Sequence, residues 1–299
     1  MTHGLREAIY VRVLGSLMAR VLAQAAPGLV LDGALGTQLL DQDGLSASPT
    51  QRVRPVCALS VDQPERVRTV YAAYFAAGAD VIHTNTFGAT RHDLAPAGRS
   101  DVRAINLGAA LLAREVRPAG RWIIGDVSPP WRPDLDEATL VDGHAEQASF
   151  LMEGGVDALH LETQHAVREV TAGLAGLRRG APGLPVWISF ALSDTGLESV
   201  SGVPLQELVA AVGPDEPERP LVLGLNCSLR PDRMLEAFTL ARALDPRFLL
   251  FQPIVGDPDV GPAAFAAAGR AALDRGAHAV GGCCGTGPAH IAALRAALA

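Results

Sequence analysis

The sequence is short of cysteine, of clustered basic residues and of long apolar runs, and each shortage excludes a class of protein. Four cysteines among 299 residues are too few for a disulfide scaffold and fit a reducing, cytoplasmic setting. The 25 Lys and Arg residues form no run and are outnumbered by 32 Asp and Glu, so nucleic acid is not an expected partner. No stretch of about 18 uninterrupted apolar residues occurs, so no membrane span is predicted.

The chain also lacks the composition of a disordered protein and has no linker that divides it. Apolar residues make up 48% and charged residues 19% of the sequence, which is enough for a large core. A length of 299 residues is typical of a single α/β barrel. We therefore expect one domain over residues 27–299, with its loosest stretches at 41–54, 129–137 and 213–220.

The first 26 residues form a separate segment. Residues 9–21 are apolar enough to resemble a signal peptide, but Arg12 and Arg20 interrupt the apolar stretch and argue against secretion. We expect residues 1–26 to form a short helical extension across one end of the fold. A translation start at Met18 is an alternative.

Short apolar runs rich in Val, Ile and Leu predict eight β-strands. Their apolar character is continuous rather than alternating, which is typical of parallel strands covered on both faces. The runs are 28–34, 80–87, 121–127, 158–163, 185–192, 221–227, 248–254 and 277–283.

Stretches with helical spacing lie between these runs. In the first, apolar side chains at 67, 70, 71, 74 and 75 recur with the period of an amphipathic helix. The predicted helices are 64–77, 102–116, 141–153, 167–178, 205–212, 231–243, 262–275 and 288–298. Strand-then-helix units repeated in this way predict an α/β fold that is a single, closed (β/α)8 TIM barrel. A doubly wound open sheet is the alternative.

Cysteines at the ends of two predicted strands indicate a metal centre. Cys227 ends the sixth strand, and Cys283 and Cys284 end the eighth within the glycine-rich stretch GGCCGTG. The carboxyl ends of all strands converge at one mouth of a barrel. Thiolates favour zinc, and three protein ligands with one exchangeable position are the catalytic arrangement. The alternatives are buried cysteines that act as small hydrophobic residues and a Cys283–Cys284 disulfide; Cys57, without such context, is expected to be structural.

Several segments resemble motifs of the homocysteine S-methyltransferase family. This family includes the homocysteine-binding module of cobalamin-dependent methionine synthase, betaine–homocysteine methyltransferase and the S-methylmethionine-dependent enzymes. The match runs in order from about Gly28 to the C-terminus, and the two cysteine motifs are specific when taken together. The segments are 32–37 (DGALGT), 84–90 (TNTFGAT), 161–163 (LET), 201–202 (SG), 224–228 (GLNCS) and 281–286 (GGCCGT).

The resemblance implies a zinc enzyme in which the sulfur of homocysteine takes the fourth metal position. A free thiol with a pKa of about 8.5 is mostly protonated at neutral pH, whereas coordination to zinc removes its proton. The implied activity is a zinc-dependent S-methyltransferase that makes methionine, with Cys227, Cys283 and Cys284 as the metal ligands. The implied methyl donor is a sulfonium, S-methylmethionine or S-adenosylmethionine, or a methyl-corrinoid on a separate protein.

The resemblance also implies which residues bind the substrate. Asp32 and Glu162 would hold the α-ammonium of homocysteine, although each is also explained as a helix cap or a solvated charge. Phe87 would line the site of the methyl donor or, alternatively, only cover the hydrophobic core. The full set of expected substrate contacts is Asp32, Gly33, Thr84, Asn85, Phe87, Glu162 and Asn226.

Three further polar residues in or at the ends of predicted strands have a supporting role in this interpretation. We expect His83 and His160 to be packed or hydrogen-bonded rather than metal ligands. Asp126, at the end of the third strand, is expected to contact the site residues rather than the substrate.

The sequence departs from the family pattern at two places. Residues 253–256 (PIVG) replace the more usual Pro-Asn-small-Gly, and no tryptophan lies near residues 56–58. Both changes fall where the donor or the substrate tail is expected, so the donor stays open. The alternative functions are methylation of another thiol or a selenol, a zinc-binding barrel without turnover, and a thiol redox protein without metal.

Overall fold

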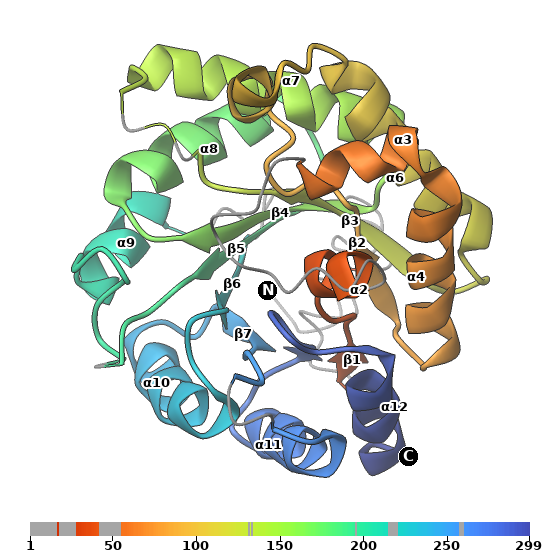
Figure 1. Ribbon diagram of the computed structural model, residues 1–299. Coiled ribbons are helices and arrows are strands. Elements are labelled where there is room, and N and C mark those ends of the chain that lie inside the picture. The colour runs from red at the N-terminus through yellow and green to blue at the C-terminus, as the bar shows by residue number, and fades with distance from the viewer. Residues whose placement is uncertain are drawn as a thin grey trace, which may run out of the picture.

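The computed structural model describes residues 17, 28–41, 55–130, 132, 134–194, 196–214, 221–256 and 260–299. Within them, parallel strands form one eight-stranded sheet in the order β1-β8-β7-β6-β5-β4-β3-β2. A parallel bridge between Leu31 and Val81 joins the two ends of this order and closes the ring (Figure 1). The predicted (β/α)8 barrel is confirmed, and the alternative of an open doubly wound sheet is wrong.

Each predicted strand is present, and most are shorter than the apolar run that predicted them. The residues of a run that are not part of the observed strand lie mainly at the carboxyl end of the run. There, Gly, Pro and polar residues turn the chain toward the mouth of the barrel. The strands are β1 (Leu29–Val30), β2 (Val81–His83), β3 (Trp122–Val127), β4 (Ala158–Gln164), β5 (Val186–Phe190), β6 (Leu221–Asn226), β7 (Phe248–Gln252) and β8 (Ala279–Val280).

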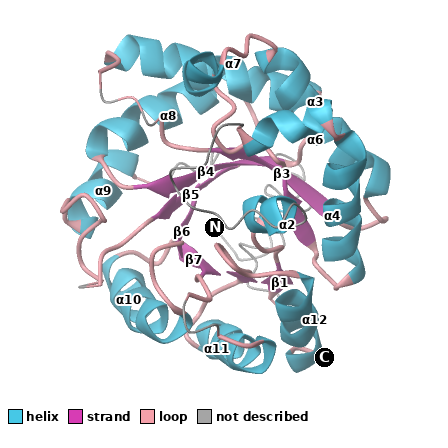
Figure 2. Cartoon of the chain, viewed as in Figure 1, coloured by secondary structure: helices cyan, strands magenta, loops and turns pink. Residues whose placement is uncertain are grey.

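All eight predicted helices are present and surround the barrel (Figure 2). Helix α7 begins before its predicted start because Asp136 caps it, accepting a hydrogen bond from the Thr139 amide at 2.7 Å. None of the described helices combines the length and apolar character that crossing a bilayer requires. The helices are α4 (Pro64–Ala76), α6 (Val102–Val116), α7 (Glu137–Glu153), α8 (Val167–Gly180), α9 (Leu205–Val212), α10 (Pro231–Leu244), α11 (Pro262–Asp274) and α12 (Pro288–Ala297).

Short helices that the sequence did not predict follow β1 and β2. Figure 1 shows α2 inside the ring of outer helices. These elements follow the carboxyl ends of strands, so they belong to the face of the barrel that carries the mouth. They are α2 (Leu35–Asp41), η2 (Val56–Ala58), α3 (Leu59–Asp62), α5 (Arg91–Leu94) and η3 (Ala95–Ala97).

Parts of three expected segments lie outside the described residues. They are most of the extension at 1–26, the loose stretch at 42–54 and residues 215–220. Leu17, the one described residue of the extension, is helical and buried. It packs in an apolar cluster with Leu29 and Val81, so this point of the extension contacts the barrel.

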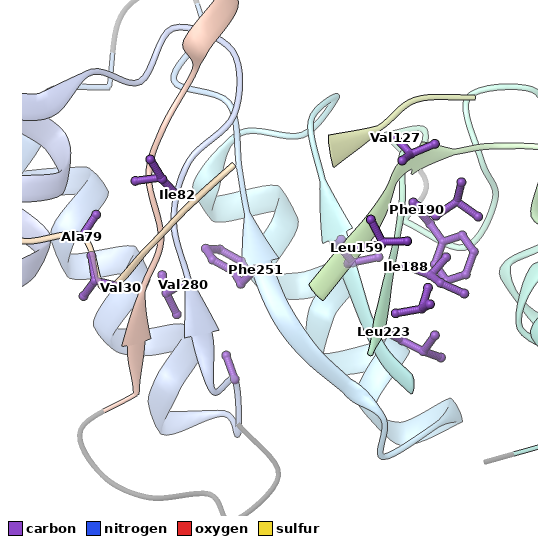
Figure 3. Packing of buried hydrophobic residues seen from close by; sticks show 14 of the residues in the cluster. Val30, Ala79, Ile82, Val127, Leu159, Ile188, Phe190, Leu223, Phe251 and Val280 are labelled. Carbon is purple, nitrogen blue, oxygen red and sulfur yellow. The ribbon is translucent and has the colours of Figure 1, made fainter. Parts of the chain in front are cut away.

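Two apolar layers stabilise the barrel wall. Outward-facing strand residues such as Ile82, Leu159 and Leu223 belong to the main cluster, which the surrounding helices cover (Figure 3). A second cluster draws on every strand, with Val81 and Trp187 among its members, and therefore fills the interior of the barrel. This interior cluster excludes water from the amino-terminal half of the barrel.

Beyond the apolar interior cluster, toward the carboxyl ends of the strands, the interior of the barrel becomes polar. Because side chains alternate with a period of two, the residues that follow the apolar interior positions by two face the same interior. At this step lie His83 on β2, Asp126 on β3, His160 on β4 and Ser189 on β5; Asn226 on β6 lies four residues beyond Val222, with Gly224 between them, and all five polar residues are buried. This polar layer lies between the apolar floor and the mouth, and the three candidate cysteines adjoin it.

Candidate metal centre and the polar layer beneath it

Three cysteine side chains from distant segments meet at the mouth of the barrel. Their Sγ atoms all lie within 4.8 Å of one another. The Cys227–Cys284 separation is 3.7 Å and the Cys283–Cys284 separation is 4.0 Å. With Zn–S bonds of about 2.3 Å, two sulfurs of a tetrahedral site lie roughly 3.8 Å apart. The spacing therefore fits three corners of a zinc tetrahedron.

An unusual backbone conformation aims Cys227 at the other two sulfurs. Cys227 and Ser228 have φ angles of 57° and 49°, in the left-handed region that residues other than glycine rarely adopt. The Cys227 amide donates to the Gln252 carbonyl at 3.0 Å, which ties the turn to the end of β7. Strain of this kind persists only where surrounding structure holds it and is common at functional sites.

The glycine-rich loop after β8 is folded tightly onto Thr286. The amide and hydroxyl of Thr286 donate to the Cys283 carbonyl at 3.0 and 2.6 Å. A Cβ at Gly282 would lie 2.4 Å from the Thr286 side chain, so this approach requires glycine. The tight turn lets two successive cysteines face one point.

The electrostatics of the three thiols favour a bound cation. A hydrogen bond from Cys283 lowers the pKa of Cys227, but contact with Cys284 and burial raise it overall to about 12. Hydrogen bonds with Cys227 and Cys284, together with burial, hold the pKa of Cys283 well above its usual range. Close thiolates repel one another, and a divalent cation with affinity for sulfur reverses that penalty. The donor set therefore fits zinc.

Asn226, immediately before Cys227, connects the cysteines to the polar layer. Its Oδ1 accepts hydrogen bonds from the Thr163 amide at 3.1 Å and the Ser189 hydroxyl at 2.8 Å. Its Nδ2 donates to Glu162 Oε1 at 3.1 Å and to Thr163 Oγ1 at 2.8 Å. The Glu162 carboxylate is therefore oriented by the residue next to a metal ligand.

Glu162 and Asp126 form a carboxyl pair beside Asn226. Burial raises the pKa of Glu162, and His83 partly opposes that effect. Burial and the neighbouring Glu162 carboxylate raise the pKa of Asp126 well above its usual range. Two carboxyls in contact, one of them buried, hold a shared proton more readily than two negative charges.

Asp32 is almost completely buried, and its carboxylate contacts His83. Oδ1 lies 2.7 Å from His83 Nδ1, and Oδ2 accepts a hydrogen bond from the His83 amide at 2.8 Å. His83 Nε2 lies 3.0 Å from His160 Nδ1, and His160 Nε2 lies 2.8 Å from the Ser189 hydroxyl. Both histidines are hydrogen-bonded, as the sequence predicts.

The polar side chains of Thr84 and Asn85, after β2, are hydrogen-bonded to other groups of the protein. Thr84 is fully buried, and its hydroxyl contacts Thr86 Oγ1 at 2.7 Å and accepts from the Asp126 amide at 3.0 Å. Asn85 donates from Nδ2 to the Val56 carbonyl at 2.9 Å. Phe87, by contrast, is partly exposed.

Gly33 allows a close approach between the loop after β1 and the metal loop. A Cβ at Gly33 would lie 2.6 Å from Thr286 Oγ1. The Gly282 amide donates to the Asp32 carbonyl at 3.0 Å, so the backbone of the two loops is joined there. Gly33 is buried and shapes the site through its lack of a side chain.

Three contributors to this region were not singled out from the sequence. Ser189 joins His160 to Asn226, and the signal for it was a lone hydroxyl in the apolar run of β5. Tyr71 and Tyr74 were identified only as part of a helical stripe. The Tyr71 hydroxyl accepts the Asn85 amide at 2.6 Å, and the Tyr74 hydroxyl donates to the carbonyls of Ala34 and Thr286, each at 3.2 Å.

The altered loop after β7 contacts the metal loop. The Pro253 carbonyl accepts the Cys283 amide at 2.8 Å, and the Val255 amide donates to the Cys284 carbonyl at 3.2 Å. This departure from the family pattern therefore lies against two of the three cysteines. Cys57 lies elsewhere, with its sulfur 3.6 Å from the Gly88 carbonyl, and burial raises its pKa to about 12.

Comparisons with known proteins agree with this geometry. The family "Homocysteine S-methyltransferase" matches residues 29–298. Methionine synthases of Mycobacterium leprae and Mycobacterium tuberculosis are 29% and 30% identical to the chain over 91% of its length. The chain spans only 24% of the length of each of these enzymes.

Solved structures give a match of similar extent. The metallated form of the homocysteine methyltransferase MmuM from Escherichia coli superposes with a TM-score of 0.77 and 26% sequence identity. That match covers 93% of this chain and 98% of the other. A methyltransferase from Methanosarcina mazei, with a TM-score of 0.58 and 14% identity, shares the fold.

Proposed function

The chain belongs to the homocysteine S-methyltransferase family, and from this membership we propose that it transfers a methyl group to homocysteine to give methionine. The observation that carries the proposal is the convergence of three cysteine sulfurs within 4.8 Å at the mouth of the barrel. The expected enzyme class, a methyltransferase, agrees with the family.

Cys227, Cys283 and Cys284 would hold the zinc ion. When bound there, zinc would lower the pKa of a coordinated substrate thiol, so that its sulfur would be a nucleophilic thiolate at neutral pH. The sulfur of homocysteine forms a bond to the methyl carbon while the bond from that carbon to the donor breaks. The bonding electrons leave with the donor, so the transfer is a single displacement that depends on positioning.

Glu162 is the best-placed group for the α-ammonium of homocysteine. Its side chain is partly exposed at the mouth, and Asn226 holds it from below at 3.1 Å. Phe87, also partly exposed, would line the path of the methyl donor. The buried members of the expected set act by positioning these groups; they are Asp32, Gly33, Thr84, Asn85 and Asn226.

The methyl donor is either a small sulfonium or a methyl-corrinoid carried by a separate protein. The match covers 98% of the MmuM chain, a homocysteine methyltransferase that is little longer than this barrel, which supports a donor that reaches the barrel free in solution. The match to 24% of each methionine synthase supports the corrinoid donor equally well. Methionine formation with S-methylmethionine, S-adenosylmethionine and methylcobalamin, each supplied separately, distinguishes them.

The test combines metal analysis with turnover. We expect the unaltered protein and the Cys57→Ala control to bind zinc and to form methionine. The variants Cys227→Ala, Cys283→Ala and Cys284→Ala should lose both zinc binding and methionine formation. Methionine formation by Cys227→Ala at the rate of the unaltered protein would contradict the proposal. Zinc binding without methyl transfer from any donor would favour a zinc-binding barrel, and turnover with another thiol only would change the acceptor.

A further inference from the structure

A continuous row of hydrogen-bonded side chains crosses the barrel beneath the cysteines. It starts at Asp32 after β1 and passes through His83, His160 and Ser189 to Asn226, with successive separations of 2.7, 3.0, 2.8 and 2.8 Å. All five residues are buried. The methyl transfer proposed above assigns no role to the two histidines.

The contacts of Asn226 determine which atom donates in each hydrogen bond of the row. The Thr163 amide can only donate, and it lies 3.1 Å from the atom assigned as Oδ1. A reversed side-chain amide would place its NH2 group against that N–H and its oxygen against Glu162 Oε1, so the assigned orientation is the one that satisfies both sides. The Ser189 hydroxyl, 2.8 Å from the same oxygen, must therefore donate its hydrogen to Asn226.

This direction then fixes the protons on the histidines. Because the Ser189 hydrogen points to Asn226, His160 Nε2 must carry a hydrogen and donate to the Ser189 oxygen. At the other end, an ionised Asp32 carboxylate can only accept, so His83 Nδ1, 2.7 Å from Oδ1, donates to it. The 3.0 Å contact between the two rings needs one more hydrogen, since two nitrogen lone pairs would repel each other there. Two neutral imidazoles carry only two ring N–H hydrogens, so the pair holds one positive charge.

The charge belongs on His83 rather than on His160. His83 adjoins the Asp32 carboxylate. His160 packs on the edge of Trp187, with ring centroids 6.4 Å apart, and its two ring nitrogens contact His83 and Ser189. Burial lowers the pKa of His83, but the Asp32 charge outweighs it and the net shift is upward. Burial and the neighbouring His83 lower the pKa of His160.

The other ionisable groups around this pair do not alter the assignment. Glu162 adds negative potential that raises the pKa of His83 further and so favours a cation there. Burial raises the pKa of Tyr71 and of Tyr74, so both hydroxyls stay neutral. The groups are Asp126 on β3, Glu162 on β4, and Tyr71 and Tyr74 on α4.

We propose that His83 is a permanently charged imidazolium that neutralises Asp32 and acts as a positioning residue for the substrate site. Both Asp32 oxygens contact His83, so Asp32 cannot supply a free negative charge for the substrate ammonium. The charge that attracts the ammonium then resides on the Glu162–Asp126 pair. This consequence rests on the proposed function, whereas the charge of His83 does not.

Nitrogen NMR of the zinc-loaded, substrate-free protein tests the charge directly. With 15N-labelled histidine, we expect both nitrogens of His83 to stay protonated from pH 6 to pH 8. His160 should be neutral over the same range, with its hydrogen on Nε2. A neutral His83 at pH 7, or a charged His160, would overturn the proposal whatever thiol the protein methylates.

Variants test the positioning role. We expect Asp32→Asn to convert His83 to the neutral form at pH 8, because the counter-charge is gone. His83→Gln should raise the KM for homocysteine roughly ten- to hundredfold, as expected for the loss of a charged hydrogen bond, with zinc content unchanged and a smaller effect on kcat. His278→Gln, a change outside the row, is the matched control. An unchanged KM in folded, zinc-loaded His83→Gln would refute the role.

Discussion

Replacing Asn226 by Asp tests whether one amide orients the substrate-binding carboxylate. The change keeps the shape of the side chain and the oxygen that accepts from the Thr163 amide. It removes the NH2 group that donates to Glu162 at 3.1 Å and to Thr163 Oγ1 at 2.8 Å. A second carboxylate oxygen then faces Glu162 Oε1 at close to the same distance.

The magnitude follows from comparing repulsion with proton uptake. At 3.1 Å and an effective dielectric constant of about 20, two negative charges repel by roughly 5 kcal/mol. Protonating a carboxyl of pKa about 4 at pH 7 costs about 4 kcal/mol. Proton uptake is the smaller cost, so the pair should hold one proton, and the free energy of unfolding should fall by about 4 kcal/mol at pH 7.

The sign of the pH dependence is also determined. The folded-state pKa of the new carboxyl pair lies above its value of about 4 in the unfolded chain, so the folded protein binds more protons between the two values. Stability of the variant relative to the unaltered protein therefore decreases as pH rises from about 5 to 7, by about 1.4 kcal/mol per unit.

Urea unfolding of the zinc-loaded protein at several pH values, with the KM for homocysteine, measures these effects. Asn106→Asp is a matched control, because Asn106 is equally buried and its Nδ2 donates to the carbonyls of Ala89 and Val102, each at 2.9 Å, which are not among the expected substrate contacts. Both variants should lose stability, but only Asn226→Asp should raise KM. A loss below about 1 kcal/mol, comparable to one ordinary hydrogen bond, or an unchanged KM would refute the reasoning.

Three further changes test other parts of the structure. Gly282→Ala places a Cβ 2.4 Å from the Thr286 side chain, so we expect a loss of about 1–3 kcal/mol and weaker zinc binding in competition with a chelator. Tyr71→Phe leaves the buried Asn85 amide without its 2.6 Å partner and should lower the free energy of unfolding by about 1–3 kcal/mol. Burial raises the pKa of Glu169 from 4.5 to about 7, so its contribution to stability falls as pH rises between these values. Glu169→Gln should therefore stabilise the protein at pH 8, by about 3 kcal/mol, and little at pH 4.

Each of these predictions has a clear contradicting result. Gly36→Ala, with no atom within 4 Å of the added Cβ, is the control for Gly282→Ala, and equal zinc affinity in both would show that the loop has room. Unfolding of Tyr71→Phe at the same urea concentration as the unaltered protein would show that the amide finds another partner. A Glu169→Gln effect independent of pH would assign the gain to packing.

The order of elements was readable from the sequence because its signals are local. Apolar runs marked all eight strands, and periodic stripes with Pro in the first turn marked α4, α10, α11 and α12. The helix α2 after β1 was missed, because it has seven residues and follows a strand directly. Short helices of this kind depend on packing rather than on their own periodicity.

The cysteines were recognisable as a candidate set because each follows a strand of a parallel barrel. Their separations were not, since they depend on the left-handed turn at Cys227 and on the close contact of Gly282 with Thr286. The roles of Asp32 and Thr84 also needed the structure, because both carry polar groups that looked free and proved to be bonded inside the protein.

The alternation of strand and helix and the resemblance to the family could be read from the chain alone, because periodicity and motif spacing are properties of neighbouring residues. Closure of the ring could not, since it depends on the bridge between Leu31 and Val81. Which polar groups share hydrogen bonds depends on the folded barrel. The row from Asp32 to Asn226 joins four strands and the loop after β1. A proton position along it is fixed by donors and acceptors far apart in the chain, which become neighbours only when the barrel closes.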